Sequence, residues 1–97
     1  MSIETADLFL RQQVELYKIF LQKNTAYGNS YQQFGAVGVI MRMGDKLMRL
    51  KTITQSSVSI DMGDESLRDT LKDLSNYCVL ALLELDRLEE EQRDIHN

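Results

Sequence analysis

The stretch DESLRDTLKDLSNYCVLALLELDRLEEEQRD, residues 64–94, decides the fold of this chain. Its apolar and small residues recur at alternating steps of four and three, at positions 67, 71, 74, 78, 81, 85 and 88. This period is typical of the seam along which one helix packs against others. Asp64 is placed to cap the first turn, because its side chain can accept hydrogen bonds from free backbone N–H groups there. The sequence therefore predicts one long helix over 64–94.

Two shorter helical segments precede this helix, each with apolar residues spaced by three and four. In the segment over about 3–23 the main positions are Ala6, Leu10, Val14, Tyr17 and Leu21. In the segment over about 34–53 they are Ala36, Ile40, Met43, Leu47 and Leu50. The interior glycines Gly38 and Gly44 each cost about 1 kcal/mol relative to alanine. We therefore expect another helix or a ligand to approach the backbone closely there.

The segments between these helices are expected to be loops. Residues 24–30, NTAYGNS, combine asparagine and glycine, which favour turns. Residues 55–63 are mostly polar, with Val58 and Ile60 interspersed, and a short strand is the alternative there. The 97 residues contain no proline and are 43% hydrophobic and 27% charged, as in soluble globular proteins. We expect a single all-α domain over 1–97, built from three main helices.

The third helix is too long for a compact domain of this size. Its 31 residues would span about 46 Å at 1.5 Å per residue, whereas a compact 97-residue domain has a radius of gyration of about 12–13 Å. Leu80 and Leu83 also lie on the side opposite the seam, so the middle of the helix is apolar all round. We expect a homo-oligomer, a homodimer or a homotetramer, joined through the helix over 64–94. The alternative is a shorter helix that frays from Glu89 onward.

The net charge of −4 is divided unevenly along the chain. Up to Gln55 there are seven basic residues against four acidic ones, and from Ser56 onward there are four against eleven. Binding to duplex nucleic acid is not expected, because it requires clustered Lys and Arg. The longest apolar run, 78–83, is far shorter than the roughly 20 residues of a membrane helix. The amino terminus lacks the basic region of a signal peptide, so a cytoplasmic protein without membrane contact is expected.

Acidic side chains follow one face of the third helix, away from its seam. Glu65, Asp69 and Asp73 lie in this row, and carboxylates four positions apart repel each other by a few tenths of a kcal/mol. Solvent, the neighbouring basic residues or a divalent cation could offset that repulsion. Mg²⁺ suits such oxygen ligands, since it usually takes one or two carboxylates and bridges to substrate phosphates.

A basic row lies on the second helix, opposite its own apolar seam. Arg42, Asp45 and Arg49 share one face, and Lys46 is adjacent. One interpretation is a ladder of ion pairs within the helix, worth perhaps 0.2–0.5 kcal/mol per pair. The other is that Asp45 joins Asp69 and Asp73 around a metal while the three basic side chains hold phosphate oxygens. Tyr27 could stack on a base or fix the first loop to the core.

Three runs in this sequence carry a family resemblance: KNTAYGNS at 23–30, RMGDKLMRL at 42–50 and DESLRDTLKDLSNY at 64–77. Over about Lys23 to Leu85 the chain resembles the phage and bacterial family called nucleotide modification associated domain 1. That family is similar to the MazG-like all-α nucleotide pyrophosphohydrolases. The resemblance implies a MazG-like helical bundle that is completed by oligomerisation, handles nucleotides and, if phage-encoded, acts in the cytoplasm of a bacterial host.

MazG-like enzymes hold Mg²⁺ with a Glu-x-x-Glu pair on one helix and a Glu-x-x-Asp pair on another. Here the second helix supplies only Asp45, and the third has Asp69 and Asp73 at a spacing of four instead of three. In the catalytic interpretation these three aspartates hold Mg²⁺, Glu65 helps to coordinate it or activates water, and a (d)NTP is hydrolysed to monophosphate and pyrophosphate. The phosphate- and nucleotide-binding candidates are Lys23, Tyr27, Arg42, Lys46 and Arg49.

Two other functions remain open at this stage. The reduced set of carboxylates favours a non-catalytic oligomer that binds and sequesters a nucleotide or a cyclic-nucleotide signal at the subunit interface. The third interpretation is a purely structural helical adaptor, in which the charged rows are solvated surface residues that bind no ligand. No serine, histidine and aspartate set, P-loop or zinc-ligand spacing is present in the sequence, so nucleophilic catalysis is not expected.

Overall fold

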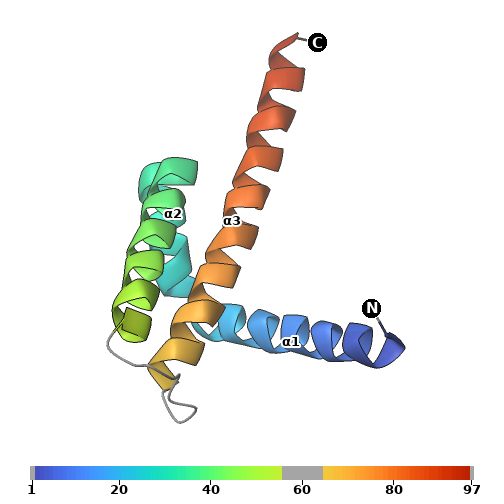
Figure 1. Ribbon diagram of the computed structural model, residues 1–97. Coiled ribbons are helices and arrows are strands. Elements are labelled where there is room, and N and C mark those ends of the chain that lie inside the picture. The colour runs from blue at the N-terminus through green and yellow to red at the C-terminus, as the bar shows by residue number, and fades with distance from the viewer. Residues whose placement is uncertain (1, 56–64, 97) are drawn as a thin grey trace.

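The computed structural model describes the backbone of residues 2–55 and 65–96, together with the side chains of 2–23, 35–54 and 66–94. These ranges form three helices and no strand: α1 (Ile3–Gln22), α2 (Asn24–Gln55) and α3 (Glu65–His96) (Figure 1). The predicted all-α class is confirmed. The strand considered around Val58 and Ile60 lies outside the described residues. No helix in the described ranges is long and apolar enough to cross a membrane.

Helix α1 begins and ends within one residue of the predicted bounds. The Ser2 side chain caps it by accepting a hydrogen bond of 3.1 Å from the backbone N–H of Thr5, which leaves fewer free donors in the first turn. At the other end the backbone N–H of Lys23 donates to the Ile19 carbonyl at 2.9 Å. These local bonds close the helix at both termini.

The predicted loop over 24–30 is wrong, because α2 is helical from Asn24 onward. The interruption lies at Gly35, whose φ of 58° and ψ of −142° are not helical. Only glycine adopts such a conformation readily, since it has no Cβ atom. Gly35 divides α2 into two arms, 24–34 and 36–55, and the second arm lies alongside α3 (Figure 1). Turn-favouring residue types are only a weak signal, and Asn24, Gly28 and Asn29 do not end the helix here.

The second arm of α2 packs inward along a face that is rotated slightly from the predicted seam. Val39 is fully buried, whereas the predicted seam residues Ile40 and Leu47 are exposed. The residues of this arm that are at least partly buried are Ala36, Gly38, Val39, Met43, Lys46, Leu50 and Ile53. Apolar residues occupy nearly every position of 36–43, so the sequence allowed more than one inward face. Ala36, Met43 and Leu50 of the predicted seam do face inward, and Val39 takes the place of Ile40.

Helix α3 confirms the predicted long helix and packs mainly against α2. Val39, Tyr77 and Leu80 form the buried core, with Phe20, Met43 and Ala81 packed against it. The leucine seam is only partly covered within one chain: Leu67 and Leu74 are half-buried, but Leu71, Leu85 and Leu88 are exposed. The side of α3 that faces the core therefore runs through Tyr77 and Leu80 rather than along the centre of the seam.

A buried carboxylate marks the place where α3 passes the break in α2. Glu84 is 3% exposed, and a Cβ atom added at Gly35 would lie 3.4 Å from its Oε1. Arg87 contacts both carboxylate oxygens of Glu84, with Nη2 to Oε1 at 2.6 Å and Nε to Oε2 at 3.0 Å. This hydrogen-bonded pair raises the pKa of Arg87 above its usual range. Glu84 also lies near the start of the second arm of α2, where a negative charge is favourable.

The molecule is extended, as the length of the third helix predicted. Its radius of gyration is 16.3 Å, compared with about 12.5 Å for a compact chain of this length. Beyond Glu84 every described side chain of α3 is exposed, and this end projects past α2 (Figure 1). α1 extends away from the lower part of α3, and none of its residues is buried.

Candidate phosphate-binding site

Asp73 of α3 forms ion pairs with one lysine at the end of α1 and with another in α2. Lys23 Nζ donates a hydrogen bond of 3.2 Å to Asp73 Oδ1. Lys46 Nζ lies 3.3 Å from the other carboxylate oxygen, Oδ2. The two lysines and the aspartate, which we call the lysine pair site, have a formal charge of +1 among the three of them.

Local structure explains why these side chains converge. Lys23 is the C-cap of α1, and Lys46 belongs to the inward side of the second arm of α2. Its aliphatic stem can lie along apolar neighbours while the ammonium group reaches polar surroundings. Asp73 precedes Tyr77 by one turn of α3, so it lies beside the buried core.

The lysine pair site is only partly buried, so its ion pairs are exchangeable. The side chains of Asp73, Lys46 and Lys23 are 15%, 26% and 45% exposed. Ion pairs that remain in contact with solvent contribute little to stability, typically up to about 1 kcal/mol each. A phosphate group could compete for the two ammonium groups at a modest cost to the fold.

The two arginines that the sequence grouped with Lys46 lie on the same side of α2. Arg42 is one turn before Lys46 and Arg49 is one turn after it, so the three are neighbours on the helix surface. Both arginines are exposed and border the lysine pair site along α2. Tyr27 lies in the first arm, and its side chain is outside the described part of the structure.

The described residues do not fit the magnesium site that the resemblance implies. Asp45 and Asp69 are exposed, and each oxygen of Asp73 faces a lysine. Within 2–23, 35–54 and 66–94 no three carboxylate, histidine or cysteine side chains form a group that could hold a metal ion. The Glu65 side chain lies outside these ranges, so its proposed part in coordination or water activation stays a prediction.

The sequence did not predict the structural role of Asn76. Its side chain is buried and its Nδ2 donates to the backbone carbonyl of Leu16 in α1, at 3.0 Å. Together with the pair between Lys23 and Asp73, this bond ties α1 to α3. An asparagine flanked by Leu74, Tyr77 and the apolar run from Cys78 is the signal that could have indicated a buried polar contact.

The family model for nucleotide modification associated domain 1 matches residues 23–85. The chain belongs to this family. No curated protein and no solved structure shows a significant match to the chain. The nucleotide modification associated domain begins at Lys23 and includes α2 and α3 as far as Leu85. All three members of the lysine pair site therefore lie inside the domain, whereas most of α1 precedes it.

Proposed function

We propose that this protein binds a nucleotide by its phosphate groups at the lysine pair site and holds it without hydrolysis. The observation that carries the proposal is the convergence of Lys23 and Lys46 on one carboxylate. Ammonium groups are point charges that bind phosphate oxygens. The Asp73 carboxylate contacts both ammonium groups, as phosphate oxygens could, and Arg42 and Arg49 lie one turn to either side of Lys46 along α2.

Membership of the nucleotide modification associated domain family supports a nucleotide as the source of that phosphate. Binding without hydrolysis is favoured over a pyrophosphohydrolase because Asp73 is paired with two cations, and no three carboxylate, histidine or cysteine side chains within 2–23, 35–54 and 66–94 form a group that could hold a metal ion. A protein of this kind would sequester its ligand, which could be a mononucleotide or a cyclic-nucleotide signal.

Calorimetric titration with ATP, dATP, AMP and cyclic AMP, in EDTA and then in Mg²⁺, tests the proposal. We expect at least one of these ligands to bind in EDTA and to be recovered intact after incubation with Mg²⁺. Release of pyrophosphate and monophosphate in proportion to enzyme would establish hydrolysis instead. No binding to any ligand would support the adaptor interpretation.

Lys46→Met should weaken binding by about 10-fold or more, because a hydrogen bond to a charged group contributes about 1.5–3 kcal/mol. The matched control is Lys18→Met. Lys18 is an exposed lysine of α1 whose Nζ lies 3.3 Å from Glu15 and which takes no part in the lysine pair site. The control should bind as the wild type does. Equal affinity of the wild type and Lys46→Met would exclude this site.

A further inference from the structure

The apolar face predicted for α1 is not covered by the part of the chain that the structure describes. Leu10, Val14, Tyr17 and Leu21 share one side of the helix, which we call the α1 stripe, and they are between 45% and 62% exposed. α1 instead contacts its own chain through Leu16, Ile19 and Phe20, which are partly buried. The helix is amphipathic, but the larger part of its apolar surface stays exposed among the described residues.

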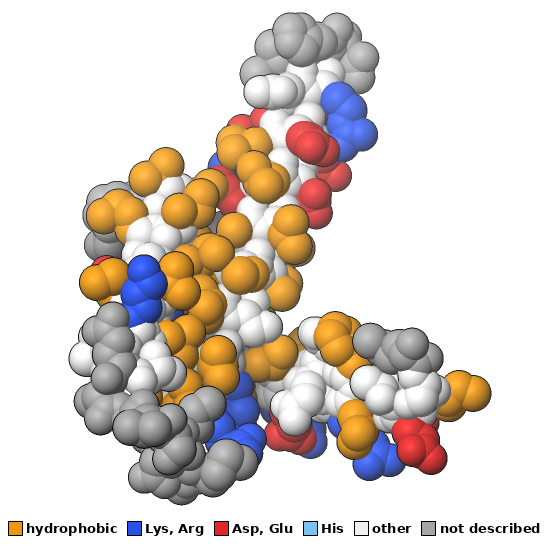
Figure 2. All heavy atoms as spheres, viewed as in Figure 1, with side chains coloured by type: hydrophobic (Ala, Val, Ile, Leu, Met, Phe, Trp, Pro, Cys, Tyr) orange, Lys and Arg blue, Asp and Glu red, His pale blue; other side chains and the backbone are white. Residues whose placement is uncertain are grey.

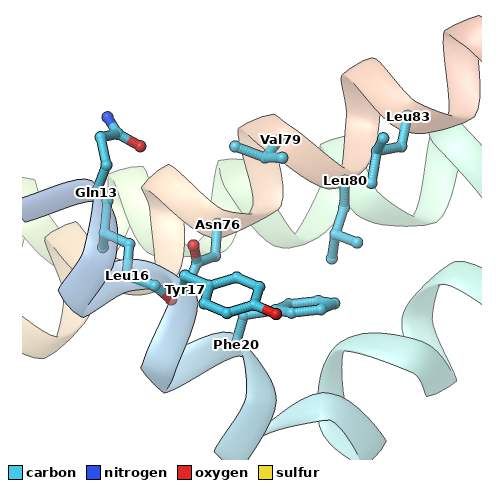
Figure 3. Close-up of a pocket in the computed structure, with 8 residues that line it drawn as sticks. All are labelled: Gln13, Leu16, Tyr17, Phe20, Asn76, Val79, Leu80 and Leu83. Carbon is cyan, nitrogen blue, oxygen red and sulfur yellow. Dashed lines mark hydrogen bonds between the residues drawn. The ribbon is translucent and has the colours of Figure 1, made fainter. Parts of the chain in front are cut away.

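A groove in the corner between α1 and α3 continues the α1 stripe. It has a volume of about 300 Å³. Its lining residues are Gln13, Leu16, Tyr17, Phe20, Asn76, Val79, Leu80 and Leu83. Figure 3 shows Leu80 extending from α3 toward the rings of Tyr17 and Phe20. The groove is predominantly apolar, and the space-filling view shows hydrophobic side chains along α3 and at the adjoining end of α1 (Figure 2).

The exposed area is larger than that of a compact folded monomer of the same mass. The accessible surface is 7750 Å², whereas a folded monomer of 11.2 kDa exposes about 5,700 Å². The surplus of about 2,000 Å² per chain exceeds the roughly 800 Å² that each partner buries in a standard stable interface. A surplus of this size is large enough for the interface of a permanent homodimer, which buries predominantly apolar surface.

A partner that covers the corner groove and the α1 stripe must therefore present an apolar surface of comparable area. A second copy does so, since α3 projects beyond α2 and exposes Leu85 and Leu88 on the projecting end. Apolar helix faces commonly pack into grooves of this kind. A two-fold arrangement would cover the same patch on both chains.

We propose that a second copy of this chain covers the corner groove and the α1 stripe. This interface would fix α1, which its own chain holds by few contacts, among them the bond from Asn76 to Leu16 and the pair of Lys23 with Asp73. The proposal concerns assembly and does not depend on which ligand the lysine pair site binds. In this arrangement the groove side of α3, at Leu83, is covered together with the seam residues Leu85 and Leu88 at its projecting end.

Size-exclusion chromatography with light scattering, on the full chain at about 100 µM, tests the interface. The wild type should have a mass at least twice 11.2 kDa. Leu83→Lys, in the groove, and Leu10→Lys, in the α1 stripe away from α3, should each shift the mass to that of one chain. Both positions are half-exposed or more in a single chain, and circular dichroism will show whether helix content is kept.

Met48→Lys is the matched control, because Met48 is an equally exposed apolar residue on the outer side of α2. This variant should remain oligomeric. A monomeric wild type, or retention of the oligomer by both Leu83→Lys and Leu10→Lys, would overturn the proposal. Dissociation by Met48→Lys to the same degree would also overturn it, because the loss would then not be specific to the corner.

Discussion

Asp73 acts as an internal counter-ion in the lysine pair site. Its two oxygens lie 3.2 Å and 3.3 Å from the ammonium groups of Lys23 and Lys46, as two phosphate oxygens could. A bound phosphate must therefore displace the carboxylate or share the lysines with it. The carboxylate keeps two like charges close together when no ligand is present.

This role gives Asp73→Asn an unusual expected outcome. The substitution removes the competing negative charge while keeping the size of the side chain, so we expect nucleotide affinity in EDTA to rise by a few-fold. A magnesium ligand at this position would behave oppositely, since its loss would weaken binding or turnover. Titration of the variant with the same nucleotides measures the sign, and a lower affinity in EDTA would contradict the counter-ion role.

The sequence predicted the participants of this site better than their arrangement. Lys23 and Lys46 were named as phosphate-binding candidates, and Asp73 was named as a metal ligand. Their convergence could not be predicted from spacing, because Asp73 is far along the chain from both lysines and helical periodicity relates only neighbouring turns. Asp45 and Asp69 are exposed. Helical periodicity alone could not distinguish a carboxylate on the open surface from one that lines a cleft.

At the level of the helices, the break in α2 shows what sequence patterns missed. Asn and Gly residues over 24–30 predicted a loop, yet the reversal of helical geometry occurs at Gly35, inside a mainly apolar stretch. A single glycine in such a stretch gives no turn signal. Only the structure shows why glycine is required at position 35: its φ is positive, and the Glu84 carboxylate lies close to the position that a Cβ atom would take.

Gly35→Ala and Gly44→Ala should therefore have opposite effects on stability. At Gly35 an alanine would have to adopt a positive backbone φ, which costs about 1–3 kcal/mol. At Gly44 the helix is regular and a Cβ atom meets nothing within 4 Å, so alanine should stabilise by about 0.5–1 kcal/mol. Urea unfolding followed by circular dichroism, at one protein concentration, measures both. A neutral Gly35→Ala would contradict the assigned break.

For the whole molecule, the sequence predicted the extended shape but not the surface left uncovered. The length of the helix over 64–94 already exceeded a compact domain, and the radius of gyration of 16.3 Å agrees. The sequence could not predict which face of α1 contacts the rest of the chain. Leu16 and Phe20 are spaced as on one helix face, and so are the residues of the α1 stripe. The packing of α1 across α3 decides between them: Leu16 and Phe20 are partly buried, and the α1 stripe stays exposed.

The central claim is that the lysine pair site holds a nucleotide intact, and native mass spectrometry tests it most directly. The purified chain would be mixed with ATP, dATP and cyclic AMP in the absence of divalent metal, alongside Lys46→Met and Lys18→Met. We predict a multiple of 11.2 kDa that carries unmodified nucleotide in the wild type and in Lys18→Met, and the same multiple without nucleotide in Lys46→Met. Equal nucleotide occupancy in Lys46→Met and the wild type would contradict the claim.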